Sequence, residues 1–157
     1  MKPKFIDLKA FTVMGILVHA MPDKVNYKAV WEDQFMPHHD HIKALSTDKA
    51  YYGIWFPHHK DGVPDYIAGM AVPDDVPTGV GMPKGVTARE IPVSRYAAFE
   101  CAMDAIGQTY GYVYNTWLAT SPYEFPPGCA DFEYYPPEGS EGTPAVYIPI
   151  REKTAAQ

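Results

Sequence analysis

The spacing of hydrophobic residues along the chain alternates between a strand-like and a helix-like pattern. Runs rich in β-branched, aromatic and apolar residues predict β-strands, and the first run is either one strand or a bent pair. Two further segments carry apolar residues at helical spacing and predict amphipathic helices. The predicted strands are residues 5–20, 50–56, 65–72, 87–91, 95–102, 131–135 and 145–151, the predicted helices are 26–45 and 104–119, and a Pro/Gly-rich loop covers 73–86.

Local signals indicate where these helices begin and break. Asn26 and Asp104 can accept hydrogen bonds from backbone N–H groups of a first turn, so each is a predicted N-cap. Pro37 falls inside the first helix. Because proline removes a backbone donor and clashes with the preceding turn, we expect this helix to be irregular near residue 37.

The two halves of the chain repeat one order of elements. Each closes with an aromatic-Pro pair, a turn, Gly-x-Pro and Tyr-Ile, at 56–67 and again at 135–148. We therefore predict one α+β domain over residues 1–157, built from two pseudo-symmetric β-α-β-β modules at about 1–75 and 85–157 on one curved antiparallel sheet. The alternative is that two Gly/Pro hairpins resemble each other by chance, because such residues mark any turn.

Composition narrows the classes of function. The formal net charge is −6 and Lys and Arg form no cluster, so we expect no direct binding of nucleic acid. No apolar run is long enough to span a membrane, no signal-peptide core follows Met1, and the two cysteines, Cys101 and Cys129, form no disulfide framework. These features predict a cytoplasmic protein. The 12 tyrosines exceed what a core of this size needs, because each buried hydroxyl requires a partner.

A series of short motifs resembles the GyrI-like proteins and the effector-binding domains of AraC-type and MerR-type multidrug regulators. The matching pieces run in family order over nearly the whole chain: 30–35, 52–54, 65–72, 91–92 with 95–99, 109–110 with 114 and 117–118, and the closing Phe132-Glu133-Tyr134-Tyr135. The resemblance implies a central ligand cleft between the two modules, with Glu133 at its floor. The chain departs from the family at 100–107, where many relatives carry His-x-Gly. It also shows no helix-turn-helix segment, so we expect a stand-alone member.

Glu133 is the central candidate for binding chemistry. Strand alternation puts Glu133 and Tyr135 on one face of the strand, and Phe132 and Tyr134 on the other. A carboxylate on the core side must be paired, protonated or ready to bind a cation, and aromatic rings add cation–π attraction. The alternative is that Glu133 lies on the solvent face of an ordinary amphipathic strand.

The other candidate walls of the cleft are aromatic. They are Trp31, Phe35, Phe56, Tyr66, Tyr110 and Trp117. Aligning the two hairpins makes Ile54 and Phe56 the counterparts of Glu133 and Tyr135, so the cleft would carry its charge on one side only. Any single aromatic ring is more often a core residue than a ligand contact. We therefore predict that these residues line the cleft as a group, not that each of them does.

We expect no metal and no cofactor. His38, His39 and His41, with Asp40 and the pair His58-His59, lack a recognised ligand spacing and are predicted surface residues.

The sequence therefore predicts a domain that binds bulky aromatic, cationic small molecules, such as drugs or effectors, or sequesters them. Two alternatives stay open. One is a hydrolase of strained cyclopropane-bearing toxins, in which Glu133 is the general base or an electrostatic stabiliser and a tyrosine hydroxyl orients the substrate. The other is a protein-interaction module of the gyrase-inhibitor type, whose partner would be a regulator or a topoisomerase.

Overall fold

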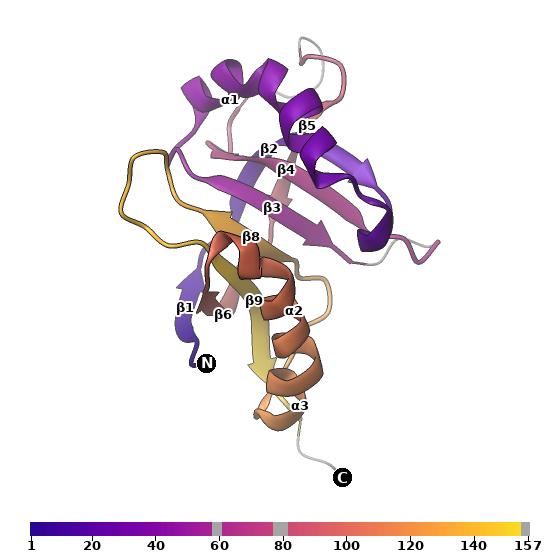
Figure 1. The fold of residues 1–157 in the computed structure, drawn as a ribbon, viewed down its shortest axis with the longest axis vertical. Helices are drawn as coiled ribbons and strands as arrows, with labels where there is room; N and C mark the ends of the chain where they lie inside the picture. Colours follow the sequence, from indigo (N-terminus) through magenta and orange to yellow (C-terminus); the bar gives the residue numbers. More distant parts are fainter. Residues whose placement is uncertain (58–60, 77–81, 155–157) are drawn as a thin grey trace.

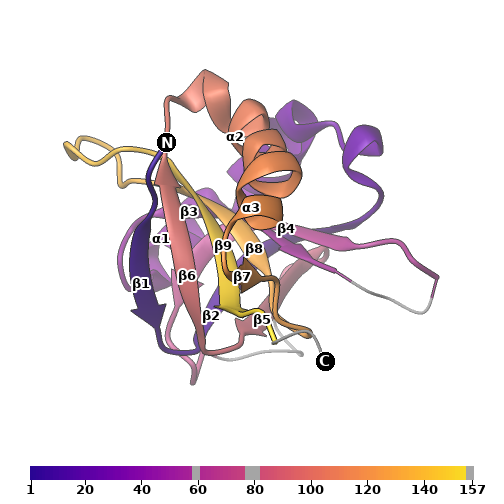
Figure 2. The same ribbon diagram turned by 90° about the horizontal axis from the view of Figure 1, so that it is seen from below.

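Nine strands form an antiparallel sheet with helices on one face (Figures 1 and 2). The computed structural model describes residues 1–57, 61–76 and 82–154. The strands are β1 (Lys4–Leu8), β2 (Phe11–His19), β3 (Tyr51–Phe56), β4 (Asp65–Val72), β5 (Val86–Ile91), β6 (Ser94–Glu100), β7 (Tyr123–Glu124), β8 (Asp131–Tyr135) and β9 (Ala145–Glu152). The helical segments are η1 (Pro22–Lys24), η2 (Ala29–Phe35), η3 (Met36–His38), α1 (His39–Leu45), η4 (Met103–Ala105), α2 (Ile106–Tyr112), η5 (Val113–Trp117) and α3 (Leu118–Thr120).

The order of strands reflects two similar halves. Along the sheet the order is β1-β6-β9-β8-β3-β4-β2-β5, and β7 pairs with β9 outside this path. The first half gives β2, a helical region, β3 and β4, and the second gives β6, a helical region, β8 and β9, so the predicted fold class is confirmed. The halves join where β3 pairs with β8. The predicted run at 5–20 is a bent pair, and its first strand pairs with β6 of the second half, while β5 pairs with β2 of the first.

Both helical regions change their winding along their length. In the first, the backbone N–H of Ala29 donates to Asn26 Oδ1 at 3.1 Å, as the predicted N-cap requires. A π-helical segment (η2) then leads into a 3₁₀ turn that contains Pro37, and α1 follows, so the irregularity expected near Pro37 is confirmed. The prediction for Asp104 is wrong: Asp104 lies inside the η4 turn, whose N-cap is Ala102, and its side chain caps no helix.

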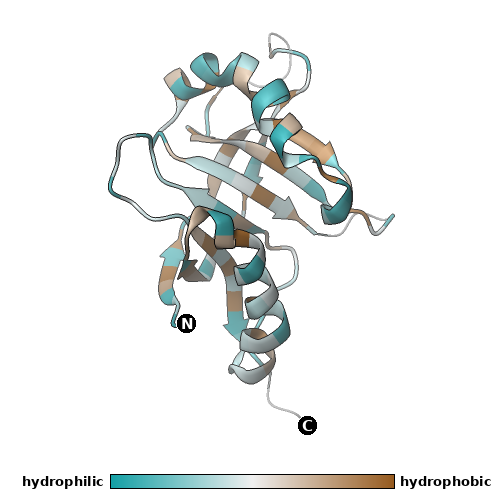
Figure 3. Ribbon diagram, in the orientation of Figure 1, coloured by the Kyte–Doolittle hydropathy of each residue, from teal (hydrophilic) through white to brown (hydrophobic). Residues whose placement is uncertain are grey.

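Hydrophobic residues fill both faces of the sheet. On the helix-covered face, one cluster packs under η2 and α1 around Phe35 and Tyr66, and a second packs under α2 and α3 around Phe99. The opposite face holds a third cluster that includes Tyr52, Ile54 and Phe132. Figure 3 accordingly shows hydrophobic residues along the strands and hydrophilic ones on the outer turns of the helices. None of the helices in the described ranges is long and apolar enough to cross a membrane.

Candidate ligand-binding site

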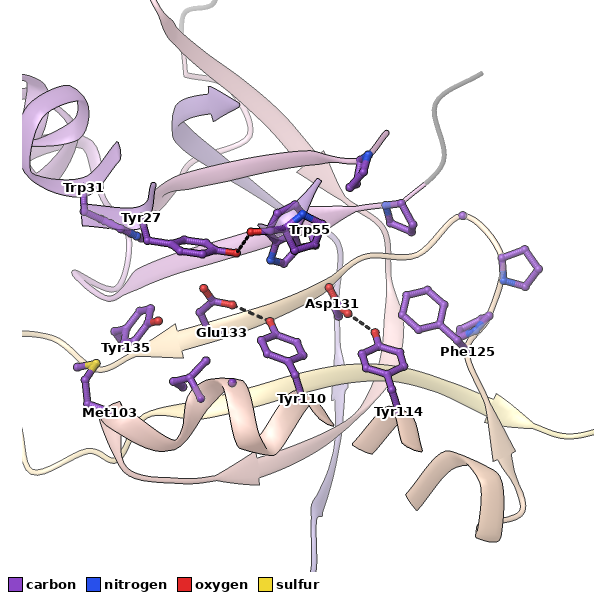
Figure 4. Close-up of a pocket in the computed structure, with 18 residues that line it drawn as sticks. Tyr27, Trp31, Trp55, Met103, Tyr110, Tyr114, Phe125, Asp131, Glu133 and Tyr135 are labelled. Carbon is purple, nitrogen blue, oxygen red and sulfur yellow. Dashed lines mark hydrogen bonds between the residues drawn. The ribbon is translucent and has the colours of Figure 1, made fainter. Parts of the chain in front are cut away.

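A cavity of about 1040 Å³ lies between the helices of the two halves, above the β3–β8 junction (Figure 4). Its volume is at the upper end of the range of about 300–1,000 Å³ that is usual for small-molecule sites. Its walls are mainly aromatic rings and prolines. The rings are those of Tyr27, Trp31, Trp55, Tyr110, Tyr114, Phe125 and Tyr135.

Glu133 lies on β8 at the floor of this cavity and is only 4% exposed. Its Oε2 accepts a hydrogen bond from the Tyr110 hydroxyl at 2.6 Å, and its Oε1 accepts one from the Tyr66 hydroxyl at 3.3 Å. The Tyr66 oxygen in turn accepts from Trp31 Nε1 at 3.2 Å. Burial raises the pKa of both tyrosines well above the usual value, so these hydroxyls stay protonated and remain donors. The two halves of the chain therefore hold one carboxylate between them.

Asp131 is a second buried carboxylate in the same cavity, two residues before Glu133 on β8. Its Oδ2 accepts a hydrogen bond from the Tyr114 hydroxyl. Its Oδ1 is buried and has no hydrogen-bond partner among the described residues. A buried oxygen without a donor is costly, so Asp131 is the less well satisfied of the two carboxylates.

The two carboxyl groups differ from ordinary surface acids in their pKa. The pKa of Glu133 is raised to about 7, mainly by burial and in part by the charge of Asp131, while the hydrogen bonds from Tyr110 and Tyr66 oppose the rise. Burial likewise raises the pKa of Asp131 to about 6, against the hydrogen bond from Tyr114. The described residues that line the cavity include no Lys, Arg or His. Within the described part of the lining, no protein cation therefore balances the negative charge of this site.

Four of the residues predicted from the sequence line the cavity: Glu133, Tyr135, Trp31 and Tyr110. The solvent-face alternative for Glu133 is wrong, because its side chain is buried. Tyr66 is fully buried behind the cavity wall and reaches the site through its hydroxyl contact with Glu133.

The other three predicted walls lie in the hydrophobic core, outside the cavity lining. Phe35 is fully buried behind Trp31, with ring centres 5.2 Å apart. Trp117 packs on Phe99 at 5.1 Å, toward the outer end of the second helical region. Phe56 points to the opposite face of the sheet, where the guanidinium carbon of Arg89 lies 3.9 Å from its ring centre.

The predicted equivalence of Ile54 in the first half with Glu133 in the second half is also wrong, because the two side chains lie on opposite faces of the sheet. In the β3–β8 register Gly53 lies directly opposite Glu133, and Trp55 lies opposite Asp131. Since side chains alternate along a strand, Ile54 belongs to the other face, where it is fully buried. The expectation that the charge lies on one side agrees with the structure, because both acidic lining residues come from β8.

Among the lining residues that sequence reasoning missed are four aromatic residues and a second acid: Tyr27, Trp55, Tyr114, Phe125 and Asp131. Two of them carried a usable signal. Asp131 is two residues from Glu133 on a strand, and Tyr114 is four residues from Tyr110 on a helix, so each shares the face of a residue that was predicted.

Among the histidines, His39 departs from the predicted surface position. Its side chain is 12% exposed, stacks on the Tyr51 ring and has Nε2 2.6 Å from the Tyr51 hydroxyl. His58 and His59 lie outside the described residues. Within the described ranges, no group of three or more His, Cys, Asp or Glu residues is placed to hold a metal ion.

A ligand-sized cavity between two β-α-β-β halves is typical of a domain that binds small molecules. Comparison with protein families gives the same class. The chain belongs to the family described as Cass2, integron-associated effector binding protein, whose model matches residues 4–150. The predicted membership of the effector-binding family is thereby confirmed.

Relatives of known sequence or structure cover nearly the whole chain. The transcriptional regulator BrlR of Pseudomonas aeruginosa is 27% identical over 96% of this chain, which spans only 56% of the length of that regulator. The structure of SAV2435 bound to tetraphenylphosphonium superposes with a TM-score of 0.75 at 15% identity, covering 96% of this chain and 94% of that one. An integron cassette protein from the mobile metagenome of Vibrio cholerae superposes with a TM-score of 0.63 at 18% identity, covering 96% and 97%. At these identities the solved structures establish the fold alone.

Proposed function

We propose that this chain binds bulky aromatic cations in the cavity above Glu133. The observation that carries the proposal is the buried Glu133–Asp131 pair in an aromatic-walled cavity whose described lining supplies no positive charge. A ligand cation would supply that charge. It would also gain cation–π contacts of about 0.5–2 kcal/mol each, depending on how far the contact is desolvated.

Two further observations support this function. The cavity is large enough for a molecule with several rings, and its walls are largely apolar. In addition, SAV2435, which shares the fold, was solved with tetraphenylphosphonium, a cation that carries four aromatic rings.

Calorimetric titration with a matched pair of ligands tests the proposal. Methyltriphenylphosphonium is the cation, and triphenylphosphine oxide is a neutral molecule of similar shape. We expect the wild-type chain to bind the cation more tightly than the neutral ligand. Glu133→Gln, which keeps the side-chain size, should weaken binding of the cation by about 1–3 kcal/mol, the scale of a pair of opposite charges several ångströms apart in a partly buried site, and affect the neutral ligand much less.

The control is Glu90→Gln, which removes the same charge from an exposed position on β5. It should leave both affinities within about twofold, because the net charge at a distance is screened by salt. Equal losses for both ligands in Glu133→Gln, or equal losses in Glu133→Gln and Glu90→Gln, would contradict a charge-based site.

A hydrolase is the second candidate, and the pKa of Glu133 favours it. A carboxylate with a pKa of about 7 is suited to act as a general base near neutral pH, and the Tyr110 hydroxyl, which donates to Glu133, would hold that carboxylate in position. In that case Glu133→Gln would retain binding of a cyclopropane-bearing electrophile but abolish its hydrolysis, which product chromatography would detect. The protein-interaction alternative stays a prediction. Its test is a partner whose binding survives Glu133→Gln.

A further inference from the structure

The two carboxylates of the cavity belong to two similar units that lie side by side (Figure 4). Glu133 and Asp131 are two residues apart on β8 and so share one face, with backbones roughly 7 Å apart along the strand. Tyr110 and Tyr114 are four residues apart on the facing helix, and their rings stack at 6.4 Å with an angle of 11°. Each tyrosine donates to one carboxylate, Tyr110 to Glu133 and Tyr114 to Asp131.

The two units differ in the hydrogen bonds that remain open. Both oxygens of Glu133 already accept a bond from a tyrosine hydroxyl. Asp131 accepts through Oδ2 only, while its buried Oδ1 has no partner among the described residues. Each oxygen of Glu133 thus already has a tyrosine donor, whereas Asp131 has one oxygen with no donor among the described residues. A cation with an N–H donor fits the second position better than one without.

The surroundings of Asp131 form a separate end of the cavity. Trp55 is its direct partner across the β3–β8 register, and the Tyr114 and Phe125 rings lie near it in Figure 4. Tyr135 and Met103 lie at the other end, beyond Glu133. A ligand with one cationic group neutralises one carboxylate and leaves the other buried without a counter-charge, at a cost that a second cationic group would remove.

We propose that Asp131 forms a second cation subsite, and that the preferred ligand is a bulky aromatic cation with an additional ammonium or amidinium group roughly 7 Å from the first charge. This inference rests on the proposed function, because the first subsite is the one at Glu133. It narrows the ligand class from single cations to aromatic dications with one N–H-bearing end.

A ligand series separates the two subsites. Triphenylphosphonium cations with an ω-aminoalkyl chain of two to eight methylene groups carry a phosphonium without N–H and an ammonium with it. The corresponding alkyltriphenylphosphonium cations lack only the amine. In calorimetric titrations at fixed salt we expect the amine to improve affinity by about 10- to 100-fold, with an optimum at intermediate chain length.

Two variants test whether the affinity gained from the amine comes from contact with Asp131. In Asp131→Asn the gain from the amine should fall below about threefold, while the amine-free cation keeps most of its affinity, because Glu133 remains. In Tyr114→Phe the gain should persist or increase, because Asp131 then has both oxygens free. Circular dichroism and thermal unfolding show whether each variant is folded. If Asp131→Asn does not fold, the chain-length optimum and the Tyr114→Phe result decide the question.

The outcomes are distinguishable. If no phosphonium binds wild type, the proposed function fails, and the second subsite with it. If the amine-free cations bind but the amine adds nothing at any chain length, the proposed function stands and the second subsite is wrong. A gain that persists undiminished in folded Asp131→Asn would also overturn the assignment to Asp131.

Discussion

Gly53 lies directly opposite Glu133 in the register of β3 and β8, and the missing side chain at position 53 is what makes room for the carboxylate. A Cβ atom at this position would come within 2.5 Å of Glu133 Oε1 and within 2.5 Å of the Tyr66 hydroxyl. Such distances are shorter than van der Waals contact, so the acid and its donor could not both keep their places.

Gly53→Ala should therefore impair the site and strain the fold. We expect a loss of stability of about 1–3 kcal/mol, the usual cost of overpacking, as measured by urea denaturation. We also expect weaker binding of methyltriphenylphosphonium in calorimetric titration, because Glu133 is displaced. Unchanged stability and unchanged affinity would mean that the carboxylate is not held against β3.

Gly111→Ala provides the opposite case. Gly111 lies in α2, and a Cβ atom there would meet nothing within 4 Å. Because alanine loses less backbone entropy than glycine in a helix, the variant should gain about 0.5–1 kcal/mol in stability. Urea denaturation under the same conditions as for Gly53→Ala checks this, and a loss of stability would show that the helix does not tolerate a methyl group at this position.

The stability of the fold should depend on pH through Glu133. Its pKa is about 7 in the folded chain against an ordinary value of 4.5, so between these pH values the folded state keeps a proton that the unfolded chain has lost. The contribution of this group is fully present below about pH 4.5 and is lost as the pH rises through about 7. Glu133→Gln removes this loss, so its stability relative to wild type should rise over that window, by about 3 kcal/mol at most.

Denaturation of both proteins between pH 4 and pH 8 measures this difference. The titratable groups that interact with Glu133, and so could affect this stability difference, are Asp131 and the hydroxyls of Tyr27, Tyr66, Tyr110 and Tyr135. Of these only Asp131 titrates in the same window, and Asp131→Asn measures its share. A stability difference that stays constant over the window would show that Glu133 titrates near its ordinary pKa.

Ligand binding should change with pH in the opposite direction. A phosphonium has no proton to lose, and it binds the ionised carboxylate better than the neutral acid. Affinity for methyltriphenylphosphonium should therefore rise as the pH increases through about 7 and level off above it. Binding should also release protons, which calorimetry in two buffers of different ionisation enthalpy detects. A flat pH profile would contradict the expected titration of the site.

Substitutions of Trp55 and Trp117 should distinguish a residue of the cavity wall from a residue of the core. Trp55 lines the cavity, whereas Trp117 stacks on Tyr123 and packs on Phe99. We expect Trp117→Phe to lower stability by about 1 kcal/mol and leave ligand affinity unchanged. Trp55→Phe should weaken binding of the phosphonium, because tryptophan has the stronger cation–π face. Equal effects of the two variants on affinity would place Trp117 near the ligand after all.

Much of the fold could be predicted from the sequence, because the strands and helices carry a clear period. The runs that became β3, β4 and β8 are rich in aromatic and β-branched residues, and Pro37 marked the break in the first helical region correctly. The short strand β7 could not be predicted, because two residues show no alternation. Asp104 has the chemistry of an N-cap but lies two residues after the N-cap Ala102, and no sequence signal fixes a helix end to a single residue.

The candidate site was harder to predict because its residues depend on the face of each strand. Aligning the hairpins paired Phe56 with Tyr135, but Trp55 shares the face of Tyr135. A shift of one residue turns every side chain of a strand to the other face. An alignment error of one residue therefore selected the core residue Phe56 in place of Trp55, which lines the cavity. Phe125 lies in a loop without periodicity, and Tyr27 precedes the helical stripe, so the cavity drew on residues that no pattern marks.

The exchange of first strands between the halves has a consequence for how the chain can be divided. Because β1 completes the sheet of the second half and β5 completes that of the first, neither half closes its own edge. A fragment that contains only one half would expose the unpaired backbone of β2 or β6. Such an edge strand can pair with another chain and cause aggregation. The halves are thus mutually dependent for solubility, and the cavity between them cannot open by simple separation of two independent lobes.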